Sequence, residues 1–378
     1  MVYQMGGRLL AWRGPGLPAG GSGSSVDRGF ERVALGLARS RGFEREVPGL
    51  ARPRSFEGKA QGLARPRASS GRPGASEARE LPAGRPSAPD GMGVRLKPAS
   101  FAYHRAGSVP AAIALLAELG DEAKILAGGL SLVPMMNFRL ARPTALVDVT
   151  RIPGLSYLRA DGAGLRIGAL TTHRAIETST DPAVLAGFGV LPRAARWIGH
   201  YPIRARGTFG GSIAHADPAS EWCLLALLLG AQIVLHGPGG QRVVPAEEFL
   251  QGYYTTDAAP DEMITEVWFP RPARGAVLHE FAQRQGDFAI AAAAVQADIA
   301  DGTLRSVGVV VGGVGPLPVQ IDTAGAVGQP ARSQTWQALG ELAAGQVDPP
   351  SDTHGSGEYR KRLTATLVSR ALAQAAGA

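Results

Sequence analysis

Two glycine pairs flanked by hydroxyl side chains carry the clearest sign of chemistry in this sequence. The first glycine segment is Ala127, Gly128, Gly129, Leu130 and Ser131, and the second is Thr208, Phe209, Gly210, Gly211 and Ser212. Paired glycines let the backbone approach a ligand closely and turn several N–H groups toward it, while hydroxyls add donors. Either pair alone also suits a plain tight connection. Together they favour a pyrophosphate cradle that needs no Lys or Arg.

The sequence departs from the common nucleotide-binding and hydrolase motifs. Neither glycine segment fits the G-x-G-x-x-G dinucleotide fingerprint or the G-x-x-x-x-G-K-[ST] phosphate loop, so a Rossmann or P-loop enzyme is disfavoured. No G-x-S-x-G elbow occurs, which disfavours a serine hydrolase. The cradle must therefore be of another type.

Three further residues near the second glycine segment invite a chemical interpretation. His215 and Asp217 could ligate a cation together, but no second ligand cluster accompanies them. We expect Asp217 to cap the helix that follows and His215 to lie in a loop. The only cysteine, Cys223, stands in an apolar run and predicts a buried helix residue. One cysteine excludes a disulfide within the chain and a four-thiolate iron–sulfur site, and it favours a reducing compartment, the cytoplasm.

Charge is distributed unevenly along the 378 residues. Residues 1–91 hold 15 basic and 8 acidic residues, which accounts for the whole net charge of +7, and the remainder holds 24 of each. This segment is rich in Gly, Pro, Arg and Ser and repeats Gly-Leu-Ala-Arg every 13 residues. Its composition predicts a disordered, basic, repeat-containing extension that is non-native or dispensable, with Met92 as the true start. No apolar run is long enough to predict a membrane span.

From residue 99 onward the pattern is that of a folded α+β protein. Helices are predicted at 109–120, 182–198 and 222–229, and strands at 124–127, 145–149, 165–168, 232–235 and 263–269. A linker-like stretch at 270–275 predicts a domain boundary. Beyond it, a hairpin is expected around Asp301-Gly302, and then a final helix with Tyr359, Leu363 and Leu367 on its packed side. Arg360, Lys361 and Arg362 are expected on the solvated side.

The two glycine segments and their surroundings resemble the FAD-binding medium subunit of the molybdenum hydroxylases, the carbon monoxide dehydrogenase and xanthine dehydrogenase family. The resemblance covers essentially everything from about Lys97 to the C-terminus. The matching stretches, in the family's order, are residues 127–134, 167–172, 206–218, 252–256, 261–267 and 284–290. Departures include Leu130, Ala205, Phe209 and Glu221, where the family more often has a polar residue, Asn, Ile and Asp.

The resemblance implies a two-part FAD-binding domain of the PCMH type over residues 92–272, with subdomains at about 92–150 and 151–272. A small α/β C-terminal flavoprotein domain over 276–378 follows. It implies FAD as cofactor, with its pyrophosphate held by residues 127–131 and 208–212 and the ribityl side of the cofactor contacted by Glu221. No acid or base in this chain is named as catalytic, since the flavin performs the redox step.

The family also implies a role in a complex. The chain would be an FAD-dependent electron-transfer subunit, taking electrons from iron–sulfur clusters of a partner and delivering them to an external acceptor. The molybdenum cofactor and the 2Fe–2S clusters would lie on a large molybdopterin-binding subunit and a small iron–sulfur subunit. These are the expected partners, in a dimer of heterotrimers, and no nucleic-acid partner is expected. One alternative is a non-enzymatic scaffold whose basic tail contacts nucleic acid. Another is a single-chain oxidase or reductase, although the chain lacks length for a separate substrate domain.

Overall fold

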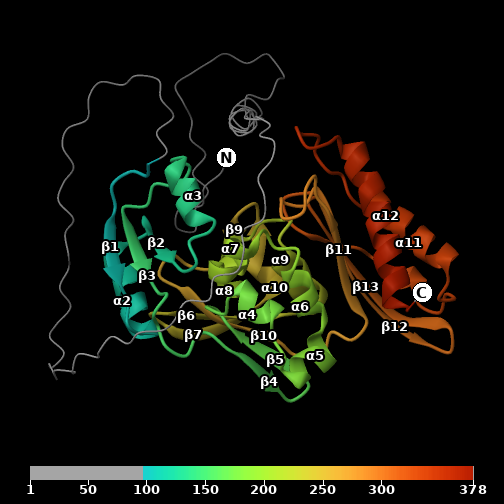
Figure 1. The fold of residues 1–378 in the computed structure, drawn as a ribbon, viewed down its shortest axis with the longest axis horizontal. Helices are drawn as coiled ribbons and strands as arrows, with labels where there is room; N and C mark the ends of the chain where they lie inside the picture. The colour runs from blue at the N-terminus through green and yellow to red at the C-terminus, as the bar shows by residue number, and fades with distance from the viewer. Residues whose placement is uncertain (1–96, 378) are drawn as a thin grey trace, which may run out of the picture. The chain divides into compact units, whose positions relative to one another are not determined.

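The structure is a computed structural model that describes residues 97–377, so the predictions made for residues 1–91 lie outside the described residues. Within 97–377, no helix combines the length and the apolar character that crossing a membrane requires. Three sheets with their covering helices make up this part of the chain (Figure 1). Of three hydrophobic clusters, the largest lies on the second sheet and extends to one face of the third.

The first sheet holds the strand that leads into the first glycine segment. It is parallel, in the order β1 (Ala102–Arg105), β3 (Ala145–Asp148) and β2 (Ala123–Leu126). Helix α2 (Val109–Leu119) packs against it. Ser108 accepts the Ala111 N–H at the start of α2, and Gly120 ends the helix with φ +73°. These bounds confirm the helix predicted at 109–120 and both strands.

The second sheet is antiparallel and forms the largest core. Its order is β4 (Leu158–Asp161), β5 (Gly164–Gly168), β10 (Met263–Phe269), β6 (Gln232–Gly237) and β7 (Gly240–Pro245). The short helices near it are α4 (His173–Glu177), α7 (Tyr201–Arg206), α8 (Phe209–His215), α9 (Glu221–Leu228) and α10 (Ala246–Phe249). A two-stranded ribbon, β8 (Leu250–Gly252) with β9 (Thr255–Thr256), completes this part.

The prediction of one continuous helix over residues 182–198 is wrong. The chain instead forms α5 (Pro182–Phe188) and α6 (Val190–Ala195), separated at Gly189. Pro192 has no N–H to donate to the Phe188 carbonyl, as a continuous helix would require, and Gly189 is a poor helix former. The two helices therefore meet at the point where both effects coincide.

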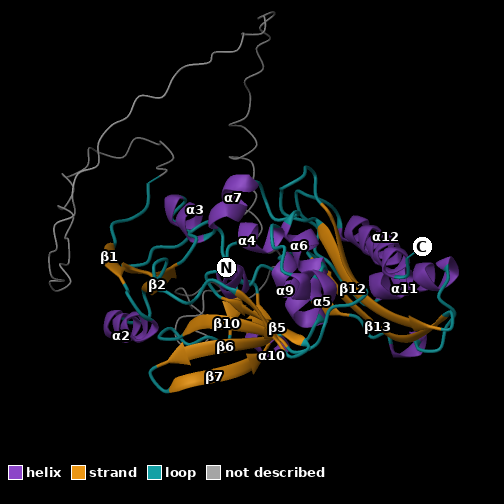
Figure 2. Ribbon diagram, turned by 60° about the horizontal axis from the view of Figure 1, so that its bottom comes forward, coloured by secondary structure: helices purple, strands orange, loops and turns teal. Residues whose placement is uncertain are grey.

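The third sheet forms the C-terminal part. Strands β11 (Ala276–Phe281), β12 (Ala291–Ala300), β13 (Thr303–Gly312) and β14 (Val319–Gln320) are antiparallel. Helices α11 (Ser333–Gly345) and α12 (Gly357–Ala375) cover one face of the long β12–β13 hairpin, as Figure 2 shows. Asp301 and Gly302 have φ +52° and +70°, which confirms the turn predicted there.

Arg360 corrects the predicted faces of the final helix. It is only 6% exposed, and its guanidinium donates to the carbonyl oxygens of Ile290 and Gly313 and pairs with Asp352 at 2.6 Å. A periodicity argument places any Arg in solvent, whereas here three acceptors compensate for its burial. Arg360 thereby ties α12 to the ends of the β12–β13 hairpin.

Candidate functional site

The first glycine segment connects β2 to α3 (Leu132–Asn137) and leaves its N–H groups free. Gly129 has φ +72°, a conformation that glycine adopts without strain, and its carbonyl accepts the Val133 N–H at 3.0 Å. Among residues 97–377, no acceptor receives the backbone N–H groups of residues 128–131. Four successive unpaired donors at a half-buried turn form a suitable site for anionic oxygens.

The second glycine segment differs, because the protein itself accepts its N–H groups. Phe209 donates to Thr171 O at 2.8 Å, and Gly210 donates to Ala169 O at 2.9 Å. Gly211 donates to the Thr208 hydroxyl at 3.2 Å and Ser212 to Thr208 O at 3.0 Å, so Thr208 caps α8. The expectation that both segments turn free N–H groups toward a ligand is therefore corrected for this one.

The side chains of the second glycine segment have separate tasks. Phe209 is fully buried and packs on Trp222, with ring centroids 4.9 Å apart, so only its backbone can face a ligand. Ser212 Oγ lies 2.9 Å from Ser220 Oγ. The Thr208 hydroxyl accepts from Gly211 and retains its own hydrogen for donation. This segment thus supplies shape and hydroxyls, whereas the first supplies main-chain donors.

The first glycine segment lies against the backbone that directly precedes the second segment. A Cβ added to Gly128 would stand 2.4 Å from Arg206 O and 2.9 Å from Gly207 Cα, closer than real atoms approach. A Cβ on Gly210 would meet the Ala169 Cβ at 2.6 Å. The Gly128 contact therefore places the first segment beside residues 206–207, at the start of the second, whereas Gly210 packs on Ala169, which belongs to neither segment. Glycine is required at both positions, because a side chain would meet neighbouring atoms at either one.

Glu221, the first residue of α9, lies beside a second carboxyl group that the sequence analysis missed. Burial and the neighbouring Glu280 raise the pKa of Glu221 well above its ordinary value. Burial also raises the pKa of Glu280, on β11, to about 7, and Glu280 Oε2 is a buried atom without a hydrogen-bond partner. Two neighbouring carboxyls, one buried and one partly buried, resist ionising together, which is consistent with the raised pKa of each. The only sequence signal was an acidic residue within a mostly apolar strand.

His215 is the last residue of α8, which corrects the expectation that it lies in a loop. Asp217 Oδ1 accepts the Ala219 N–H at 2.8 Å in a turn, rather than capping α9 as expected. The His215 ring lies 4.9 Å from the Tyr254 ring. No group of three His, Cys, Asp or Glu side chains within residues 97–377 is arranged to hold a metal ion. Cys223 is buried on α9, as predicted, and burial raises its pKa to about 12.

His173 is a second residue that sequence reasoning missed. Trp222 Nε1–H donates to His173 Nδ1 at 3.0 Å, and the His173 backbone N–H donates to Gly207 O at 3.0 Å. Burial, assisted by the positive charge of Arg204, lowers the pKa of His173 to about 4. The residue directly follows the stretch 167–172 that matched the family, yet a lone histidine there gave no sign of its partner.

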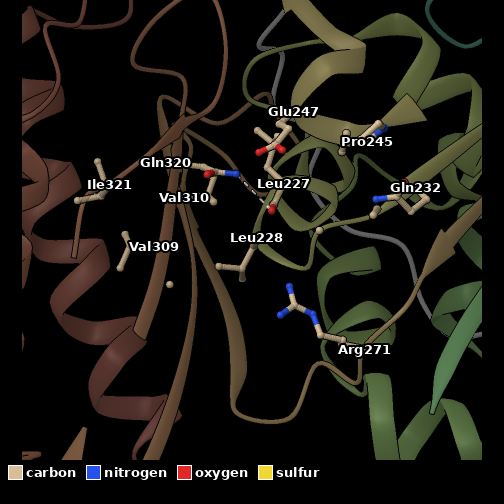
Figure 3. A pocket seen from close by; sticks show the side chains of 14 residues that line it. Leu227, Leu228, Gln232, Pro245, Glu247, Arg271, Val309, Val310, Gln320 and Ile321 are labelled. Atoms are coloured by element: carbon tan, nitrogen blue, oxygen red, sulfur yellow. Dashed lines mark hydrogen bonds between the residues drawn. The ribbon is translucent and has the colours of Figure 1, made fainter. Parts of the chain in front are cut away.

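A cavity of about 350 Å³ lies elsewhere, where the end of α9 approaches β13 and β14 (Figure 3). Gln320 reaches toward Leu227 O at 3.5 Å, and Arg271 and Gln232 line the opposite side. None of the residues in the two glycine segments lines it. The glycine segments, not this cavity, therefore define the candidate site.

Two family models match consecutive parts of the chain. The model described as the FAD binding domain in molybdopterin dehydrogenase matches residues 99–272. The model described as the CO dehydrogenase flavoprotein C-terminal domain matches residues 276–375. Both glycine segments, His173 and Glu221 fall within the first match, and Glu280 falls within the second.

Relatives of known activity extend along the same region. The chain is 39% identical over 285 residues to the alpha subunit of the 6-hydroxypseudooxynicotine dehydrogenase complex of Paenarthrobacter nicotinovorans, covering 74% of this chain and 96% of that subunit. It is 35% identical to the carbon monoxide dehydrogenase medium chain of Hydrogenophaga pseudoflava, covering 73% and 96%. A solved carbon monoxide dehydrogenase from that organism aligns with a TM-score of 0.71 at 36% identity, covering 74% of this chain and 98% of that one.

Proposed function

Because the chain belongs to the FAD-binding medium subunits of the molybdenum hydroxylases, we propose that it binds FAD where its two glycine segments meet. The observation that carries this proposal is the row of four free N–H groups at residues 128–131, next to a backbone approach that only glycine permits. Both features suit a pyrophosphate, which needs several donors at short range and no side chain in the way.

Each predicted site residue then has a distinct part. The N–H groups of Gly128, Gly129, Leu130 and Ser131 would donate to the pyrophosphate, with Ala127 setting the turn after β2. Thr208 and Ser212 would add hydroxyls, while Phe209, Gly210 and Gly211 would form the close wall. Glu221 would face the ribityl side, where a protonated carboxyl can donate a hydrogen bond. Bound FAD would supply the redox chemistry.

We further propose that the chain works within a complex. A large subunit would carry the molybdenum cofactor and a small subunit the 2Fe–2S clusters, in a dimer of heterotrimers. The complex would pass electrons from those clusters to an external acceptor by way of this subunit. The division of labour suits a chain with a single buried cysteine, which cannot ligate such a cluster. We propose the same domain limits as above, 92–272 and 276–378.

The visible absorption spectrum of the purified full chain, with the released cofactor identified by mass, tests this function. Flavin bands and released FAD are the expected result. A folded chain that stays colourless when FAD is added would contradict the proposal, and released FMN would contradict the pyrophosphate cradle. Molybdenum or iron bound to the chain purified alone would contradict the division of cofactors among subunits.

A further inference from the structure

The imidazole of His173 lies against Gly207, the residue just before the second glycine segment. His173 begins α4 and is 5% exposed. A Cβ built on Gly207 would stand 2.7 Å from both Nε2 and Cδ2 of this ring. Gly207 is also the residue whose Cα closely approaches Gly128. One edge of the ring therefore lies against the same residue that Gly128 approaches.

The hydrogen bond from Trp222 determines which ring nitrogen carries the proton. An indole Nε1–H can only donate, so His173 Nδ1 must accept and carries no hydrogen. Since the ring is buried and neutral, its single proton lies on Nε2. Trp222 is itself fixed, because it is fully buried and packs on Phe209. The protonated nitrogen is therefore held on the edge that faces Gly207.

This Nε2–H has no acceptor within the part of the chain that the structure describes. The nearby Gly207 carbonyl already receives the backbone N–H of His173 itself. Within residues 97–377, four unpaired side-chain polar atoms are completely inaccessible to solvent, and His173 Nε2 is not one of them. This nitrogen therefore retains some solvent exposure. A fixed donor that is unpaired but accessible, on a ring that contacts the same Gly207 as Gly128 does, is suited to a ligand oxygen.

We propose that His173 is a further FAD-binding residue, which donates from Nε2–H to a pyrophosphate oxygen, and that Trp222 is the positioning residue that fixes its tautomer. The inference rests on the proposed FAD site and adds to it a donor outside both glycine segments. The donor is neutral, in keeping with a cradle that otherwise uses backbone N–H groups and hydroxyls rather than cationic side chains.

The test compares His173→Phe with the double variant His173→Phe/Trp222→Phe in the full chain. The single variant leaves a buried indole N–H without a partner and should lower the melting temperature. The double variant removes both polar partners and keeps two flat rings, so the melting temperature of the FAD-free protein should largely recover. The dissociation constant for FAD should nonetheless stay weaker by roughly tenfold, the loss of about one neutral hydrogen bond. The matched control is His236→Gln, which alters a histidine on β6 that is hydrogen-bonded to Thr265 on β10. This variant should bind FAD as the wild type does.

Two spectroscopic readouts separate donation from simple packing. In wild-type protein with ¹⁵N-labelled histidine, His173 should show a protonated Nε2 whose signal moves when FAD binds. The ³¹P signals of bound FAD should shift in the double variant. A double variant that binds FAD within twofold of wild type would overturn the proposal. If the variants fail to fold, the NMR measurement on the wild type decides: a His173 ring protonated at Nδ1 would overturn the proposal. A wild-type chain that binds no FAD would overturn the proposed function and this inference together, whereas the other outcomes concern His173 alone.

Discussion

The two glycine segments resemble each other in sequence, yet the structure gives them opposite hydrogen-bonding states. The N–H groups of residues 128–131 have no acceptor within residues 97–377, whereas those of residues 209–212 are donated to Ala169, Thr171 and Thr208. The first segment lies at the end of a small parallel sheet, and the second is built into the largest core. A glycine pair therefore does not identify a ligand-binding turn until the acceptors of its N–H groups are known.

The largest expected effect comes from Gly128→Ala. Its Cβ would stand 2.4 Å from Arg206 O, a backbone atom that cannot move alone, so the two segments must separate. We expect FAD binding to weaken by about 3 kcal/mol, more than a hundredfold, because the free N–H groups lose their position relative to Gly207. The dissociation constant from flavin fluorescence measures this. The melting temperature of the FAD-free protein should fall as well, because the clash is with backbone. Gly239→Ala, with nothing within 4 Å of its added methyl, is the control.

Gly210→Ala should act mainly on stability and less on FAD binding than Gly128→Ala. The added Cβ would lie 2.6 Å from the Ala169 Cβ and 2.8 Å from its Cα, in the buried core beneath α8. Overpacking there should cost roughly 2–3 kcal/mol of the free energy of unfolding. Urea unfolding of the FAD-free chain measures it. If Gly210→Ala reduced FAD affinity without loss of stability, the distinction between the two segments would be wrong.

Much of this arrangement could be predicted from the sequence, but the distinction between the segments could not. Periodicity and turn chemistry correctly located the strand at 263–269, the Asp301-Gly302 hairpin and the helix ended by Gly120. Local patterns carry such information because they act over a few residues. Contacts between distant residues left no local signal, as the Trp222–His173 hydrogen bond and the Glu221–Glu280 pair demonstrate. The burial of Arg360 was missed for the same reason, since its acceptors lie 70 and 47 residues away.

A change of pH should alter the free energy of unfolding through two buried groups, His173 and Glu280. His173 has a pKa lowered to about 4, so its contribution to stability is present above its ordinary value and lost as pH falls. Glu280 has a pKa raised to about 7, so its contribution is present at acid pH and lost as pH rises through 7. Between pH 7 and pH 5 the two trends oppose each other, each by roughly 2 kcal/mol.

Variants should reveal the two opposing trends. The double variant Glu221→Gln/Glu280→Gln removes both carboxyls with raised pKa values, and its free energy of unfolding should fall by roughly 2 kcal/mol from pH 7 to pH 5. His173→Gln removes the imidazole trend and should become more stable over the same interval. Urea titrations of the FAD-free chain at several pH values measure both. Equal pH profiles for the wild type and the variants would show that neither group controls the pH dependence of the free energy of unfolding.

The smallest expected effect compares the two serines that end the segments. Ser131 is exposed and makes no hydrogen bond through its hydroxyl within residues 97–377, whereas Ser212 Oγ is 2.9 Å from Ser220 Oγ. Ser131→Ala should therefore weaken FAD binding by about 1 kcal/mol, several-fold, with the unfolding free energy unchanged. Ser212→Ala should lower the unfolding free energy by a similar amount, because Ser220 loses its partner. Measuring both quantities for both variants decides the matter: if Ser131→Ala destabilised the fold and left FAD binding intact, the first segment would be a structural turn like the second.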